Sequence, residues 1–174
     1  MIDTQRLKLI PLTYGQLVKY MLTDQSLEAE LQLNPTTRSI SHELKEALEE
    51  TILPNVADSS KNYLFSTLWT VILKTENSMV GDLCFVGEPN QLGEVEIGYG
   101  TYEDFRKKGF MTEAVGGIIG WATTQQNIKT IVASTDKDNP ASAGVLQKNN
   151  FKLSGETEAL FNWKLDLASL NISR

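Results

Sequence analysis

Hydrophobic and polar positions alternate first with the period of a strand and then recur with that of a helix. Apolar and basic residues alternate over residues 6–12, which predicts a short strand. Thr13 and Ser41 each precede apolar residues at helical spacing, so each is expected to cap a helix, the second of which ends at Pro54. A further short helix is expected over residues 25–33. The first third of the chain is therefore predicted to be one strand followed by helices.

The rest of the chain is rich in β-branched and aromatic residues and returns to helical spacing twice. Gly98 and Gly100 interrupt one predicted strand, and glycine in a strand often marks a close backbone approach. The order of elements predicts a mixed α/β (α+β) fold in a single domain spanning residues 1–174. The expected elements begin with an antiparallel meander of three strands over residues 68–74, 79–86 and 94–100. A helix over 112–126, a strand over 129–135, a helix over 140–148 and a hairpin over 151–166 are expected to follow.

Composition then narrows the classes of function. Lysine and arginine number 16 against 22 aspartates and glutamates, a formal net charge of −6, which argues against a nucleic-acid partner held by bulk charge. A single cysteine, Cys84, excludes an intramolecular disulfide and a cysteine-rich zinc site, so we expect no metal. No apolar run is long enough to cross a bilayer and the N-terminus lacks a signal-peptide pattern. We therefore expect a cytoplasmic protein with no membrane partner.

One loop departs from this acidic background. Residues 102–112 place a basic triplet, residues 106–108, and Gly109 between a predicted strand and a predicted helix. A helix N-terminus presents unpaired amides and a positive dipole end, and a glycine lets the chain turn such amides inward, so the loop is a candidate anion site. A solvated basic turn is the alternative. The sequence has no Walker-type phosphate loop, and Glu103 occupies the third glycine position of a dinucleotide fingerprint.

These loop residues resemble a known family. Residues 106–111, Arg-Lys-Lys-Gly-Phe-Met, are similar to the coenzyme A pyrophosphate loop of the GNAT superfamily of N-acetyltransferases, whose pattern is Gln/Arg-x-x-Gly-x-Gly/Ala. The sequence departs from the family pattern at Met111, at Lys107, where a second glycine is common, and at Asn150, which replaces a glycine. Further segments resemble the branch that acetylates N-terminal alanine or serine of ribosomal proteins, and they occur in the expected order over residues 94–99, 112–114, 139–142 and 148–151.

The resemblance implies both a fold and an activity. The implied fold is a mixed, mainly antiparallel central sheet of about seven strands, flanked by helices and splayed between the fourth and fifth strands. A helical segment over about residues 13–58 lies on the acceptor side, and the coenzyme A-binding core covers about residues 72–161. The implied reaction moves an acetyl group from acetyl-CoA directly to a primary amine in a ternary complex. The acceptor is a peptide N-terminus or a small amine, and the protein is a monomer or homodimer.

The resemblance also implies the site residues. Glu96 is the expected base, acting directly or through water, and Ser142 is expected to donate a proton or a hydrogen bond to the departing thiolate. Asn139 is expected to hold the pantetheine arm. The expected cofactor-binding residues are Tyr99, Gly100, Thr101, Tyr102, Arg106, Lys107, Lys108, Gly109, Phe110, Met111, Thr112, Asn139, Ser142 and Lys148.

Simpler interpretations accompany these roles. Alternation places Glu94 and Glu96 on one face of a strand. Glu96 is therefore alternatively an ordinary charged residue on a half-exposed strand, with no catalytic role. Ser142 is alternatively a hydroxyl that satisfies an amide at a helix start. A nucleophilic pair of His42 and Cys84 is disfavoured, because the first belongs to a charged helix and the second to an apolar strand. The alternative function is a coenzyme A-binding sensor or scaffold that transfers nothing.

Overall fold

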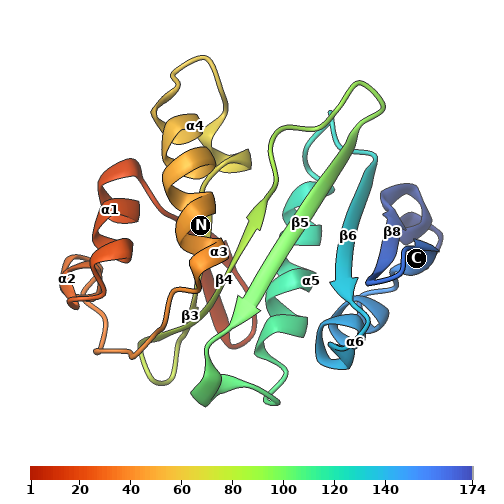
Figure 1. The fold of residues 1–174 in the computed structure, drawn as a ribbon. Coiled ribbons are helices and arrows are strands. Elements are labelled where there is room, and N and C mark those ends of the chain that lie inside the picture. The colour runs from red at the N-terminus through yellow and green to blue at the C-terminus, as the bar shows by residue number, and fades with distance from the viewer. Residues whose placement is uncertain (174) are drawn as a thin grey trace.

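The computed structural model describes residues 1–173, and an eight-stranded sheet forms its centre (Figure 1). The strand order is β1-β2-β3-β4-β5-β6-β8-β7, and every neighbouring pair is antiparallel except β5 and β6, which are parallel. The expected mixed, mainly antiparallel sheet is therefore confirmed, with one strand more than predicted. The strands are β1 (Ile2–Asp3), β2 (Leu7–Pro11), β3 (Leu68–Leu73), β4 (Ser78–Phe85), β5 (Glu94–Thr101), β6 (Thr130–Asp136), β7 (Lys152–Glu156) and β8 (Leu160–Asp166).

The sheet opens between β5 and β6, as the family resemblance implies. The two strands pair over three positions only, from Glu94 with Thr130 to Glu96 with Val132. Beyond Glu96, β5 continues to Thr101 while β6 turns away, and Figure 1 shows the two arrows diverging. Counted from β2, these are the fourth and fifth strands. The splay leaves the β6 side of this half of β5 without a strand partner among the described residues.

Helices cover both faces of the sheet. One face carries α1 to α4, and the other carries α5 and α6 (Figure 1). Buried side chains form one cluster under each layer, with Leu17, Tyr20 and Leu48 under α1 to α4 and Trp69, Phe85 and Ile118 under α5 and α6. No helix among residues 1–173 is long and apolar enough to cross a membrane. The helices are α1 (Tyr14–Leu22), α2 (Ser26–Glu30), α3 (His42–Ala47), α4 (Leu53–Ala57), α5 (Phe110–Ala122) and α6 (Pro140–Lys148).

The helix that begins after Ser41 does not end at Pro54 as predicted. A π-helical turn over Leu48–Ile52 joins α3 to α4, and the helical path runs on to Ala57. Pro54 falls in the first turn of α4, where a proline needs no amide partner. The wider π turn before it accommodates the change in hydrogen-bond pattern.

Candidate active site

The basic loop leads directly into the N-terminus of α5 in a conformation that exposes backbone amides. Gly109 is the N-cap of α5 with φ of +78°, and Lys107 also has a left-handed φ of +62°. No side chain in residues 1–173 caps this helix, so the first amides of α5 remain available for a ligand. Lys107 thus adopts the conformation that favours the glycine common in the family. The loop has the backbone shape of an anion nest, with positive charge beside it.

Arg6 fixes the base of this loop from the start of the chain. Its Nη1 donates to the carbonyl oxygen of Lys108 at 3.1 Å, and its Nε donates to Glu113 Oε2 at 2.6 Å. Glu113 Oε1 also accepts from the hydroxyl of Thr4 at 2.7 Å. Burial raises the pKa of Glu113, but the hydrogen bonds from Arg6 and Thr4 outweigh this and hold it below its usual value. The sequence interpretation missed Arg6, whose alternation with leucines indicated only a strand.

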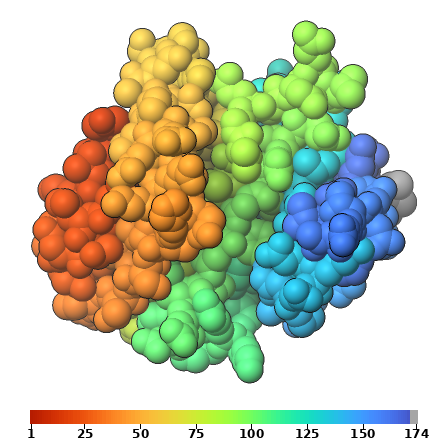
Figure 2. Space-filling view, in the orientation of Figure 1, coloured from red at the N-terminus to blue at the C-terminus, as the bar shows by residue number. Residues whose placement is uncertain are grey.

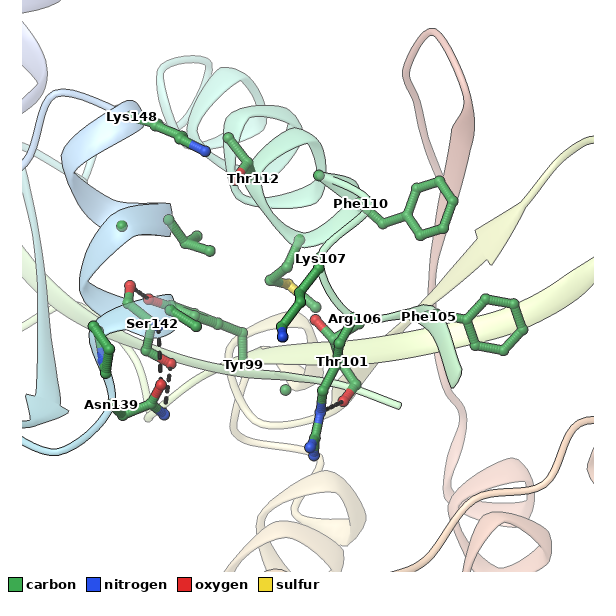
Figure 3. Close-up of a pocket in the computed structure, with 17 residues that line it drawn as sticks. Tyr99, Thr101, Phe105, Arg106, Lys107, Phe110, Thr112, Asn139, Ser142 and Lys148 are labelled. Carbon is green, nitrogen blue, oxygen red and sulfur yellow. Dashed lines mark hydrogen bonds between the residues drawn. The ribbon is translucent and has the colours of Figure 1, made fainter. Parts of the chain in front are cut away.

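A cavity of about 750 Å³, the α5–α6 cavity, lies between this loop, the start of α5 and the start of α6 (Figure 3). Figure 3 shows the side chains of Lys107 and Lys148 reaching toward it from opposite sides. Most of the residues predicted to bind the cofactor line it, although they come from three separate segments. They are Tyr99, Gly100, Thr101, Arg106, Lys107, Gly109, Phe110, Met111, Thr112, Asn139, Ser142 and Lys148.

Hydrogen bonds fix the α6 side of this cavity. Asn139 is the N-cap of α6: its Oδ1 accepts from the Ser142 amide and its Nδ2 donates to Ser142 Oγ, both at 3.1 Å. The amide is therefore capped by Asn139 and not by the Ser142 hydroxyl. Among the described residues that hydroxyl donates no hydrogen bond, so its proton is available to a group in the cavity. Tyr99 donates to the Ser142 carbonyl at 2.8 Å and so joins β5 to α6 across the splay.

A second cavity of about 790 Å³, the helical-side cavity, lies on the other side of β5. Its walls come from α1, α3 and the segment before it, the strands β3, β4 and β5, and the segment after β5. They include Tyr20, Arg38, Leu44, Asp82 and Tyr102. Figure 2 shows the molecule hollowed between the orange segment at α3 and the blue segment at α6. Both cavities share Tyr99, Gly100, Thr101 and Arg106, so they meet at the C-terminal end of β5.

Three predicted residues lie outside the α5–α6 cavity. Tyr102 turns to the helical side, because its hydroxyl donates to Asp82 Oδ2 at 2.7 Å. Lys108 instead lies beside Phe105, with Nζ 5.4 Å from the ring centroid. Glu96 is exposed on β5 and lines neither cavity, while its neighbour Val95 is buried in the α5 layer as alternation predicts.

A buried polar cluster behind the helical-side cavity has no counterpart in the sequence prediction. Tyr20 and Tyr102 both donate to Asp82 Oδ2, each at 2.7 Å, and Asp82 is only 7% exposed. Burial raises the pKa of Asp82, and the two tyrosine hydrogen bonds and nearby Arg38 only partly oppose that rise. The guanidinium of Arg38 lies 4.6 Å from the Tyr20 ring centroid and is paired with Glu28. The sequence signal was a lone carboxylate inside the apolar strand of residues 79–86.

His42 and Cys84 lie in different environments, as expected. His42 is 88% exposed and lies 4.0 Å from Glu46 on its own helix. Cys84 lines the helical-side cavity, and burial raises the pKa of its thiol to about 11, so the thiol stays protonated near neutral pH. No cluster of three or more potential metal-binding side chains occurs in the described part of the chain.

Comparison with known proteins identifies the family. Residues 6–152 match the family described as the acetyltransferase (GNAT) domain. An uncharacterized N-acetyltransferase, YjdG of Bacillus subtilis (strain 168), is 32% identical over 95 residues, which cover 55% of this chain and 56% of the relative. The chain spans about half the length of the named relatives that it matches.

Two solved structures share the fold over nearly the whole chain. An acetyltransferase of Salmonella typhimurium that modifies the N-terminal serine of ribosomal protein L7/L12 superposes with a TM-score of 0.65, at 18% identity, over 94% of this chain and 96% of its own. The spermidine/spermine N-acetyltransferase SpeG of Vibrio cholerae gives a TM-score of 0.66 at 15% identity, over 97% of this chain and 100% of its own. At these identities the likeness concerns the fold alone. With the loop, the splayed sheet and the match over residues 6–152 together, the chain belongs to the acetyltransferase (GNAT) domain family.

Proposed function

We propose that this protein is an acetyl-CoA-dependent N-acetyltransferase that transfers the acetyl group directly to a primary amine. The observation that carries the proposal is the pair of cavities that meet at Tyr99, Gly100 and Thr101. One cavity is basic at its rim and opens on a helix N-terminus, and the other has buried acidic and aromatic groups. Two substrates that approach from opposite sides of β5 would therefore meet at its end.

The α5–α6 cavity has the chemistry of a coenzyme A site. Amides at the start of α5 and the side chains of Arg106 and Lys107 suit a pyrophosphate. The half of β5 beyond Glu96 has free backbone groups on its β6 side, and these suit the amides of a pantetheine arm. When bound, acetyl-CoA supplies a thioester as the acyl donor. Ser142, whose hydroxyl proton is available, is placed to donate to the thiolate that leaves.

The acceptor is proposed to enter through the helical-side cavity. We infer a peptide N-terminus or a small amine, because the walls combine carboxylates with aromatic and aliphatic side chains. Glu96 lies on the same strand face as Gly98 and Gly100 and stays a predicted base, which would act through water from outside the cavities. A cytoplasmic location and a monomeric or homodimeric state also stay predictions.

Coenzyme A binding and free-thiol release test the proposal together. Isothermal titration calorimetry with coenzyme A measures the first, and thiol release from acetyl-CoA across a panel of peptides, polyamines and amino acids measures the second. We expect binding of coenzyme A and turnover with at least one amine. Binding without turnover for any acceptor would instead support the sensor or scaffold.

Variants of the basic loop sharpen this test. Lys107→Ala and Arg106→Ala are each expected to raise the Kd for coenzyme A by about 3- to 10-fold, equivalent to about 0.7–1.4 kcal/mol. Lys108→Ala is expected to have a smaller effect, because its ammonium group lies over Phe105. Lys152→Ala removes an exposed charge from β7 and serves as the remote control. An equal loss for Lys107→Ala and Lys108→Ala would contradict the proposed position of the pyrophosphate.

A further inference from the structure

The carboxylate of Asp82 has one oxygen that the protein does not use. Oδ2 accepts both tyrosine hydroxyls, whereas Oδ1 is buried and makes no hydrogen bond among the described residues. The neighbouring hydroxyl is that of Thr70 on β3, which pairs directly with Asp82; this hydroxyl also lacks a hydrogen-bond partner in the described structure and lowers the Asp82 pKa. Asp82 is 7% exposed and lines the helical-side cavity. A buried carboxylate oxygen without a partner is destabilising, and native proteins rarely keep one without a reason. Two donors suit this carboxylate: the Thr70 hydroxyl within the protein, and a ligand in the helical-side cavity that Asp82 lines.

The register of the sheet directs this carboxylate toward the place where the two cavities meet. Asp82 on β4 pairs with Gly100 on β5, and side chains of directly paired residues lie on the same face with Cβ atoms about 4.5–5.5 Å apart. Gly100 lines both cavities, and a Cβ atom added there would meet nothing within 4 Å. The missing side chain at Gly100 leaves the path from Asp82 to the junction open.

We propose that Asp82 is the catalytic residue that takes the proton from the acceptor's ammonium group, and that Tyr20 and Tyr102 are positioning residues that hold its carboxylate. This inference rests on the proposed acetyl transfer. One N–H proton passes from the ammonium to the carboxylate of Asp82, which leaves a free amine and a neutral carboxyl. The amine nitrogen then forms a bond to the thioester carbon, and the carbon–sulfur bond breaks with its electron pair on sulfur. The second nitrogen proton goes to that thiolate, and Asp82 returns its proton to solvent.

The charges around Asp82 suit a cationic acceptor. Arg38 is the cation whose charge lowers the Asp82 pKa, but that charge is compensated by buried Glu28. At the rim, Glu103 and Asp104 are exposed carboxylates, and no ion pair holds either of them within residues 1–173. The titratable and charged groups that face Asp82 or its cavity come from five segments. They are Tyr20 from α1, Arg38 from the segment before α3, Cys84 from β4, Tyr99 from β5, and Tyr102, Glu103, Asp104 and Arg106 from the segment after β5.

The environment also suits a base that works near neutral pH. Burial raises the pKa of Asp82, which brings the carboxylate closer to the operating pH of a general base. Burial likewise raises the pKa of Tyr20 and Tyr102, so both remain protonated donors to Oδ2. Glu96, by contrast, is exposed and lines neither cavity. The geometry therefore favours Asp82 over Glu96 for direct proton transfer.

The pH dependence of kcat/KM for acetyl transfer, measured with an amine that the wild type acetylates, tests the proposal. Asp82→Asn is expected to lower kcat/KM by about 100-fold or more and to remove the acid limb of the pH profile, while coenzyme A still binds. Tyr102→Phe removes a hydrogen bond that lowers the Asp82 pKa, so the acid limb is expected to move to higher pH. Gly100→Ala is expected to lower kcat/KM without lowering the Tm. Glu158→Gln, an exposed change after β7, is the matched control.

Each outcome supports or overturns the catalytic role of Asp82. An Asp82→Asn variant within about threefold of wild type, or a Glu96→Gln variant that alone loses the acid limb, overturns the role of Asp82 and leaves the proposed function standing. A wild-type protein that binds coenzyme A but acetylates no amine overturns the proposed function and the inference with it. If Asp82→Asn fails to fold, the shift of the acid limb in Tyr102→Phe supports the role, and an unmoved limb overturns it.

Discussion

Loss of the buried ion pair between Arg38 and Glu28 is expected to destabilise both the fold and the wall of the helical-side cavity. The two side chains are 2% and 1% exposed. Arg38 Nη2 also donates to the Tyr20 carbonyl at 3.0 Å, and its guanidinium lies 4.6 Å from the Tyr20 ring centroid. The pair therefore supports the same tyrosine whose hydroxyl holds Asp82.

The loss of stability in each variant depends on which buried charge is left without its partner. Arg38→Met keeps much of the packing volume but leaves the Glu28 carboxylate buried without its partner, which costs about 3–5 kcal/mol. For a chain of this length, that loss lowers the Tm by about 6–20 °C. Glu28 Oε2 and Arg38 Nε have no hydrogen-bond partner in the described structure, so the pair is incompletely satisfied. The double variant Arg38→Met/Glu28→Met is therefore expected to be more stable than either single variant.

A double-mutant cycle measures this coupling directly. Urea unfolding, followed by tryptophan fluorescence, gives the free energy of unfolding of the wild type, both single variants and the double variant. Lys19→Met provides the control, because Lys19 pairs with Glu30 at 2.5 Å but the two side chains are 42% and 38% exposed. This exposed pair is expected to contribute less than about 1 kcal/mol. If Arg38→Met costs no more than Lys19→Met, the reasoning about burial is refuted.

Three glycine changes give further predictions that thermal unfolding checks. Gly81→Ala is expected to lower stability by about 1–3 kcal/mol, because its Cβ would lie 2.5 Å from the carbonyl oxygen of Gly100; an unchanged Tm would contradict this contact. Gly120→Ala is expected to raise stability by about 1 kcal/mol, since the site is exposed and helical and a Cβ there meets nothing within 4 Å. Lys107→Gly is expected to stabilise the fold by about 1 kcal/mol at its left-handed φ while weakening coenzyme A binding, and calorimetry would show whether the two effects separate.

Local signals made most of the fold predictable from the sequence. Thr13 forms a capping box with Gln16, and Ser41 and Asn139 cap helices that begin at the next residue. The bounds of α6 agree with the prediction because both of its end signals are local. Strand β1 was missed because it has only two residues, too few to show alternation.

The helix through Pro54 was missed for a different reason. The rule that proline ends a helix assumes a regular α-helix before it, and here a π-helical turn precedes it. A similar limit applies to Gly117 and Gly120, two glycines inside α5. A Cβ at Gly117 would lie 2.9 Å from Thr4 Cγ2, but Gly120 has open space around it. Composition cannot distinguish a glycine at a contact from one on an exposed helix face.

The two cavities differ in how far the sequence could predict them. The α5–α6 cavity is lined by residues that lie within 99–101, 105–112 and 139–148, short segments whose motifs can be read along the chain. The helical-side cavity brings together Tyr20, Arg38, Asp82 and Tyr102, so Tyr20 and Asp82 meet across 62 positions. Such contacts depend on how α1 packs on the sheet, which no spacing rule specifies. For the same reason, the family pattern led to Glu96 and not to Asp82.

Two sequence observations together lead to Asp82. Its predicted strand lies inside the meander, and Asp82 is a carboxylate in an otherwise apolar segment. The predicted meander places residues 79–86 between two other strands, and an inner strand covered by helices on both sides is buried on both faces, as β4 is. A carboxylate in such a strand must either be paired within the protein or serve a ligand, because isolated burial is too unfavourable to persist. Two tyrosines satisfy only one of its oxygens. Asp82 lines the helical-side cavity together with Tyr20, and this position marks the side of the sheet from which the acceptor is proposed to approach.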